Sequence, residues 1–76
     1  MIAWTSLTPE EQGRVCERIW RHLSRTGQTS TTGLMHECAM TMDHVGGALA
    51  AMELRKAVKR EENARGVELW SALKRG

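Results

Sequence analysis

Apolar residues recur at helical spacing in the first third of the chain: Val15, Cys16, Ile19 and Leu23. At about 100° per residue these positions share one helical face. Thr8 can cap the first exposed amides, and Pro9 suits the first helical position. Glu11 stands three residues after Thr8, where the carboxylate of a capping box belongs. Gly27 is a suitable stop, so the pattern predicts a helix over residues 8–26.

A second apolar pattern follows a polar stretch rich in Ser and Thr. The stretch 28–32 fits a brief strand or an extended connector, and Thr29 or Ser30 can cap the helix after it. Thr41 is placed to cap a third helix, which we expect to end near Leu54. Residues 30–54 therefore predict two helices joined by a tight turn. The apolar positions that indicate them are Leu34, Met35, Cys38, Val45, Ala48, Leu49 and Met52.

The last third of the chain changes period. Residues 57–61 alternate loosely between apolar and polar, and 67–70 have the composition of a return strand. Between them, Asn63-Ala64-Arg65-Gly66 is typical of a turn, because Asn and Gly can adopt positive φ. We therefore expect a β-hairpin over residues 57–71. Residues 1–7 form a lead-in with Trp4 and Leu7 as anchors.

Composition fits a single domain spanning residues 1–76. Hydrophobic residues make up 41% and charged residues 26%, which is typical of an ordinary globular domain. This length excludes an enzyme with separate cofactor and substrate lobes. Two cysteines are too few for a disulfide scaffold. Neither a signal-peptide pattern nor an apolar stretch of bilayer length is present, so we expect a cytoplasmic protein with free thiols.

The element order is helix, short strand, helix, helix, hairpin, and it resembles the winged helix-turn-helix superfamily. The resemblance covers about residues 8–73. It is carried by the 31–38 helix, the Ala39-Met40-Thr41 turn, the helix that contains Val45, Leu49 and Met52, and a hairpin that ends in Leu69-Trp70. The implied fold is mainly α (α+β), with three helices and a short β-hairpin wing. Nucleic acid is the partner that the superfamily most often implies.

Among such domains, the framework is most similar to winged helices that bind Z-form nucleic acid, which also end the wing with a Trp. Those domains carry an Asn and a Tyr on the exposed face of the third helix. By our alignment Gly46 and Ala50 occupy these positions, and Val67-Glu68-Leu69 replaces a proline pair before the Trp. The resemblance therefore implies the fold and not Z-form recognition.

In such a fold the third helix enters the major groove and the wing follows the backbone or the minor groove. Base readout usually needs Arg, Lys, Asn or Gln, and the central turns of this helix have none. His44 alone could contact a base edge there. Small residues could let the helix sit deep and read shape. The candidate DNA-binding residues are His44, Gly47, Arg55, Lys56, Lys59, Arg60 and Arg65.

Two other surfaces could serve a protein partner. Four small residues on the third helix would let another helix approach closely, as a dimer seam or a docking face, or they pack within the fold: Gly46, Gly47, Ala50 and Ala51. Four arginines form a stripe on the first helix facing away from its apolar positions, either as a solvated face or as a docking surface: Arg14, Arg18, Arg21 and Arg25.

Catalytic chemistry is not indicated. The pairs Glu10-Glu11 and Glu61-Glu62 are sequence neighbours that do not converge on one bond, and the chain has no phosphate-binding glycine loop. His36 and Cys38 are zinc-ligand types, but their spacing matches no closed site. We therefore expect no enzyme activity, no metal and no cofactor.

The leading functional prediction is a small DNA-binding transcriptional regulator of bacterial or phage and mobile-element type, with a homodimer as one expected state. The alternative is a winged-helix interaction module, a small inhibitor or adaptor. That module would dock through the small-residue face of the third helix or through the arginine stripe of the first. Neither prediction involves a membrane.

Overall fold

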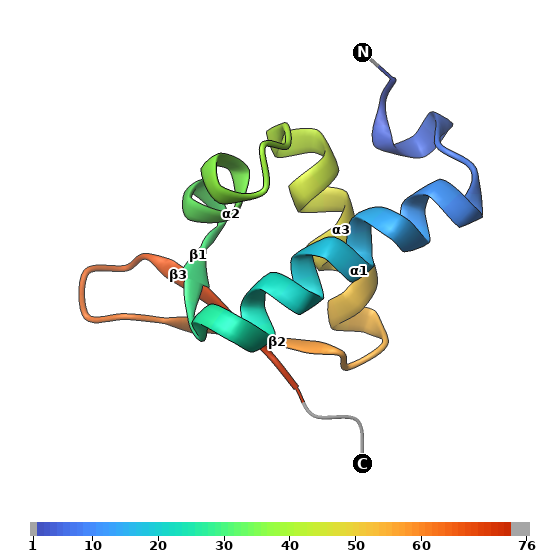
Figure 1. Cartoon of the computed structure of the whole chain (residues 1–76). Helices are drawn as coiled ribbons and strands as arrows, with labels where there is room; N and C mark the ends of the chain where they lie inside the picture. The colour runs from blue at the N-terminus through green and yellow to red at the C-terminus, as the bar shows by residue number, and fades with distance from the viewer. Residues whose placement is uncertain (1, 74–76) are drawn as a thin grey trace.

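The computed structural model describes residues 2–73, so Met1 of the lead-in lies outside the described residues. Three helices and a three-stranded antiparallel sheet confirm the predicted winged-helix fold. In Figure 1 the hairpin extends away from the three helices on the side opposite the N-terminal segment. The elements are η1 (Trp4–Ser6), α1 (Pro9–Thr26), β1 (Thr29–Ser30), α2 (Thr31–Glu37), α3 (Met42–Leu54), β2 (Val58–Glu62) and β3 (Glu68–Ala72).

Local hydrogen bonds explain where α1 begins and ends. The Thr8 hydroxyl accepts from the Glu11 amide at 3.1 Å, and a Glu11 carboxylate oxygen accepts from the Thr8 amide at 2.9 Å. This is the predicted capping box, with Pro9 in the first turn. The helix ends at Gly27, whose φ of 81° lies in the region that favours glycine.

Side-chain caps also begin the two helices of the helix-turn-helix. The Ser30 hydroxyl accepts from the Gly33 amide at 3.0 Å, and the Thr41 hydroxyl accepts from the His44 amide at 3.3 Å. Of the two caps proposed for α2, Ser30 is therefore the one used. The turn between α2 and α3 needs a φ of 52° at Ala39. The sequence does not predict this positive φ, because it is uncommon for alanine.

The sheet has the order β1-β3-β2, which makes the hairpin part of a three-stranded sheet. Thr29 and Arg60 lie opposite Trp70 from its two sides. At the tip, Gly66 has a φ of 78°, but Asn63 acts through its side chain and does not take the expected positive φ. Its amide oxygen accepts from the Arg65 amide at 2.8 Å and from the Val67 amide at 3.0 Å.

One apolar core joins the helices to the sheet. Trp70 is buried from the sheet side, and its indole N–H donates to the Thr31 hydroxyl at 3.0 Å. Because α1 and α3 pack against each other through this core, their outer faces point in opposite directions. Within residues 2–73, no helix is long and apolar enough to cross a membrane. The fully buried large side chains are Ile19, Leu23, Leu34, Val45 and Leu49.

Candidate nucleic-acid interface

The N-terminal segment lies across one side of α3. A Cβ added at Gly47 would lie 2.4 Å from the Trp4 Cγ atom, so the indole occupies the space that a side chain would need. The Trp4 amide donates to a carboxylate oxygen of Asp43 at 2.6 Å. His44 Nε2 donates to the Ile2 carbonyl at 2.6 Å, since a carbonyl can only accept. We call Ile2–Trp4 the strap.

The strap changes what α3 offers to a ligand. For Gly47 the sequence left three alternatives open, contact with DNA, contact with a partner or packing within the fold, and the structure places it beneath the Trp4 ring. The expected base-reading nitrogen of His44 is already bonded to Ile2. The close approach of Trp4 requires a glycine at position 47. Gly47 and His44 therefore both contact the strap in the described structure.

The remaining outer face of α3 combines exposed apolar and small residues with two exposed acidic residues, Asp43 and Glu53. Met42 and Leu54 are 53% and 86% exposed, and a Cβ at Gly46 would meet no atom within 4 Å. Ala50 is also exposed, whereas Ala51 is half-buried. These exposed positions follow one another at intervals of four, so Met42, Gly46, Ala50 and Leu54 form one stripe. We call it the α3 stripe, and it carries no cation.

Two of the wing cations are engaged within the fold. Arg60 lies over the Trp70 ring at 5.9 Å and contacts carboxylate oxygens of Glu53 and Glu68 at 3.7 and 3.3 Å. It therefore covers the buried tryptophan and links the end of α3 to both hairpin strands. Lys59 Nζ lies 2.9 Å from a Glu61 carboxylate oxygen on the same face of β2. Such an exposed pair is worth little and can exchange for a phosphate.

Three other cations of the predicted set have no ion pair among residues 2–73: Arg55, Lys56 and Arg65. Arg65 is exposed at the hairpin tip, where its amide and the Val67 amide both donate to the Asn63 side chain and so fix the turn. Lys56 joins α3 to β2 with a φ of 59°. Arg55 borders a hollow between α1 and α3, away from the wing tip. Only Lys56 and Arg65 thus remain exposed, unpaired and close to the wing.

The arginine stripe of α1 lies on the opposite side of the molecule. Arg14 and Arg21 pair with glutamates one turn earlier on the same helix. Arg18 donates to the Cys38 carbonyl at 2.9 Å and so binds the C-terminus of α2 to α1. Arg25 is exposed near the end of the helix. The stripe is therefore partly neutralised and partly structural.

Thiols and metal ligands give no reactive centre. Both cysteines are free, and burial raises the pKa of the Cys16 thiol and of the Cys38 thiol. Both stay protonated at neutral pH as a result. No three metal-ligand side chains gather anywhere in the described part of the chain, and His36 is exposed.

Two features lay beyond the sequence patterns. The strap depends on an indole meeting a glycine 43 positions later, and only the marking of Trp4 as an anchor hinted at it. No sequence pattern indicated the hollow between α1 and the end of α3, because the residues that line it, such as Trp20 and Arg55, come from separate elements.

Comparison with known proteins supports the fold. A solved structure of Lactococcus lactis ZitR, a double mutant in the apo form, is similar with a TM-score of 0.75 at 18% sequence identity. The match covers 86% of this chain and 50% of the ZitR chain, so this chain spans about half that length. It shows that the chain has the winged-helix fold. No family model matches the sequence, and no curated protein matches it.

Proposed function

We propose that this protein is a non-enzymatic, cytoplasmic regulator that binds duplex DNA through its wing and through the shape of α3. The observation that carries the proposal is Arg65: it is exposed at the hairpin tip, its backbone is fixed by Asn63, and no described carboxylate pairs with it. A single rigidly presented arginine is suited to a narrow minor groove. The winged-helix fold supports the proposal because domains of this fold can contact a duplex with the third helix and the wing.

The chemistry of α3 defines what kind of binding to expect. Gly46 and Ala50 are exposed and small, so the helix can approach a groove closely without hydrogen bonding to base edges. Affinity would then come mainly from phosphate contacts of Lys56 and Lys59 at the start of the wing. Discrimination between sequences would be modest and based on groove width and thymine methyls. Two copies bound to one duplex would raise the affinity beyond what the few phosphate contacts of one copy supply.

The test is binding of the purified chain to a generic duplex across a salt series, with light scattering for the mass of the complex. We expect affinity to fall steeply as salt rises. Arg65→Ala should weaken binding on every sequence and reduce the log–log salt slope by about 1. Lys59→Ala should do the same, because its pair with Glu61 is exposed.

Arg14→Ala is the matched control. It removes one exposed, helix-borne arginine from the opposite side of the molecule, where the side chain pairs only with Glu10. It should leave DNA affinity unchanged. Equal losses from Arg14→Ala and Arg65→Ala would show non-specific attraction to net charge, and no binding at low salt would reject DNA as the partner.

The α3 stripe favours a second candidate, an interaction module that docks on a helix or a hydrophobic edge of another protein. Leu54 is 86% exposed and Met42 is 53% exposed, with two small residues between them. Such a face suits close helix packing. Leu54→Glu should abolish self-association or capture of a partner on this reading, while leaving binding to DNA phosphates only weakly reduced. Unchanged association after Leu54→Glu would reject the stripe as the docking face.

A further inference from the structure

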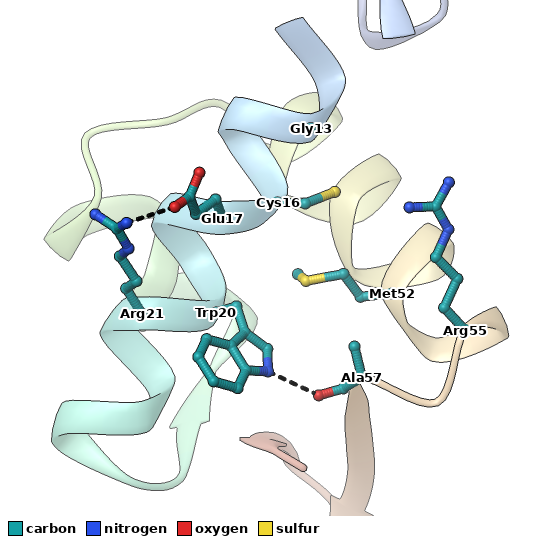
Figure 2. A pocket seen from close by; sticks show the side chains of 8 residues that line it. All are labelled: Gly13, Cys16, Glu17, Trp20, Arg21, Met52, Arg55 and Ala57. Carbon is teal, nitrogen blue, oxygen red and sulfur yellow. Dashed lines mark hydrogen bonds and ion pairs between the residues drawn. The ribbon is translucent and has the colours of Figure 1, made fainter. Parts of the chain in front are cut away.

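A hollow of about 480 Å³ lies between α1, the last turns of α3 and the start of β2. Figure 2 shows Cys16 and Trp20 reaching toward it from α1, with Met52 opposite them on α3 and Arg55 beyond Met52. Its volume is within the range of about 300–1,000 Å³ of small-molecule sites.

The floor of the hollow is apolar and its polar atoms are already engaged. The Trp20 indole N–H donates to the Ala57 carbonyl at 3.1 Å, which leaves the ring itself to contact a ligand. The Cys16 sulfur faces the Ala48 carbonyl at 3.9 Å. Water inside this floor would find few hydrogen-bond partners, so an apolar group can displace it at little loss.

The rim carries one uncompensated positive charge. Glu17 and Arg21 neutralise each other on the α1 side. Arg55, on the α3 side, has no ion pair within the described residues. Burial raises the pKa of the Cys16 thiol, and the nearby Arg55 charge opposes part of that rise. A ligand of this site must therefore combine an apolar body with a single negative charge.

We propose that the hollow binds a small monocarboxylate with an apolar chain, its carboxylate on the Arg55 guanidinium and its chain against Trp20 and Met52. Guanidinium and carboxylate form a paired, charge-assisted hydrogen bond, which gives the head group its specificity. The apolar chain supplies the remaining affinity by leaving water. The site stands on the geometry of α1 and α3 and does not depend on the proposed DNA binding.

Octanoate is the probe, with octylamine as a matched ligand of the same chain and opposite charge. We would titrate both into the full chain by calorimetry, below their aggregation concentrations. Octanoate should bind and should slow alkylation of the Cys16 thiol by a maleimide several-fold, with Cys16→Ser marking the background from Cys38. Octylamine should do neither. Equal binding of the two ligands, or octanoate binding without protection of Cys16, would overturn the proposal.

Variants of Arg55 and Gly13 test where the carboxylate and the apolar chain of octanoate bind, and Arg25→Gln is the control. Arg55→Gln should weaken octanoate several-fold, because it removes the charge that pairs with the carboxylate while the exposed position limits the size of the loss. Arg25→Gln removes an exposed arginine outside the hollow and should leave the affinity unchanged. Gly13→Leu places a side chain in the hollow, where a Cβ now meets no atom within 4 Å, and should block binding while circular dichroism stays native. Equal effects of the two arginine variants would show that net charge, and not this site, attracts the carboxylate.

Discussion

The third helix and the wing differ in what they could contribute to a nucleic-acid interface, which needs both a fitting shape and positive charge. Between Met42 and Leu54 the chain has no Arg or Lys, and the outer face of this helix combines the α3 stripe with the exposed acidic residues Asp43 and Glu53. The wing has cations on β2 and at its tip, but one of them, Arg60, lies over Trp70 and pairs with Glu68. The helix can therefore contribute shape, and the hairpin can contribute charge.

The two regions are also held in different ways. The wing is fixed to the core by Trp70, which is buried and bonded to Thr31. One side of α3 is fixed by the strap, through backbone atoms of Ile2 and Trp4 that bond to side chains of α3. Loss of the tryptophan anchor should thus affect the whole fold, while loss of the strap should affect one face of one helix.

The largest effect we expect is from Trp70→Ala, which separates the wing from the helices. Replacing a buried aromatic side chain by alanine typically destabilises a protein by about 3–5 kcal/mol. Trp4→Ala is the matched change in the strap and should destabilise much less, because Trp4 is only half-buried. Urea unfolding followed by circular dichroism measures both. Similar losses for the two variants would show that the strap is as essential to the fold as the wing anchor.

The next effect separates two adjacent glycines of α3. Gly46→Ala adds a methyl group that meets no neighbour. It should stabilise the protein by roughly 0.5–1 kcal/mol, because alanine lowers the backbone entropy of the unfolded chain. Alanine at Gly47 would collide with the Trp4 ring, and overpacking of this kind costs about 1–3 kcal/mol. Gly47→Ala should therefore be less stable than Gly46→Ala and should shift Trp4 fluorescence toward that of an exposed indole.

Fluorescence of Trp4 is read in a Trp20→Phe background, with Trp70 as the constant buried signal. If Gly47→Ala is as stabilising as Gly46→Ala and leaves the spectrum unchanged, the strap does not lie over α3 in solution.

This contrast also marks how far the sequence alone could lead. The helix ends were predictable because Thr8, Ser30 and Thr41 bond to amides three residues away, and short spacings are visible in the sequence. The core face of α3 was predictable from its period for the same reason. The positive φ at Ala39 was not, because alanine gives no signal for a conformation that the surrounding fold imposes.

The candidate site was less predictable, because its chemistry depends on partners distant in sequence. Arg60 is a predicted phosphate contact, and no sequence pattern indicated that the register would set it opposite Trp70 and beside Glu68. For Gly47 the sequence could not choose between an exposed face and packing within the fold, and only the contact with Trp4 decides it. A helical wheel describes one element, and it contains no information about what a lead-in segment covers.

A smaller effect tests whether α3 itself faces the duplex. Ala50→Lys adds a cation to the centre of the α3 stripe without touching the core, because Ala50 is exposed. If the helix meets the groove, generic DNA affinity should rise by roughly threefold to tenfold through an added phosphate contact. Ser24→Lys adds the same charge on α1, and affinity should stay within about twofold. Equal gains from both variants would show that α3 has no special position on the duplex.

The smallest effect concerns Lys56, where helix and wing join. A non-glycine residue at a φ of 59° carries a strain of roughly 1–2 kcal/mol, which glycine relieves while adding freedom to the unfolded chain. Lys56→Gly should therefore keep stability within about 1 kcal/mol but lose one phosphate contact, lowering the salt slope by about 1. Lys56→Arg keeps the charge and the strain, and should preserve the slope. If Lys56→Gly instead binds DNA as tightly as the parent chain at all salt concentrations, Lys56 serves only as a corner, and the charge of the interface comes from Lys59 and Arg65 alone.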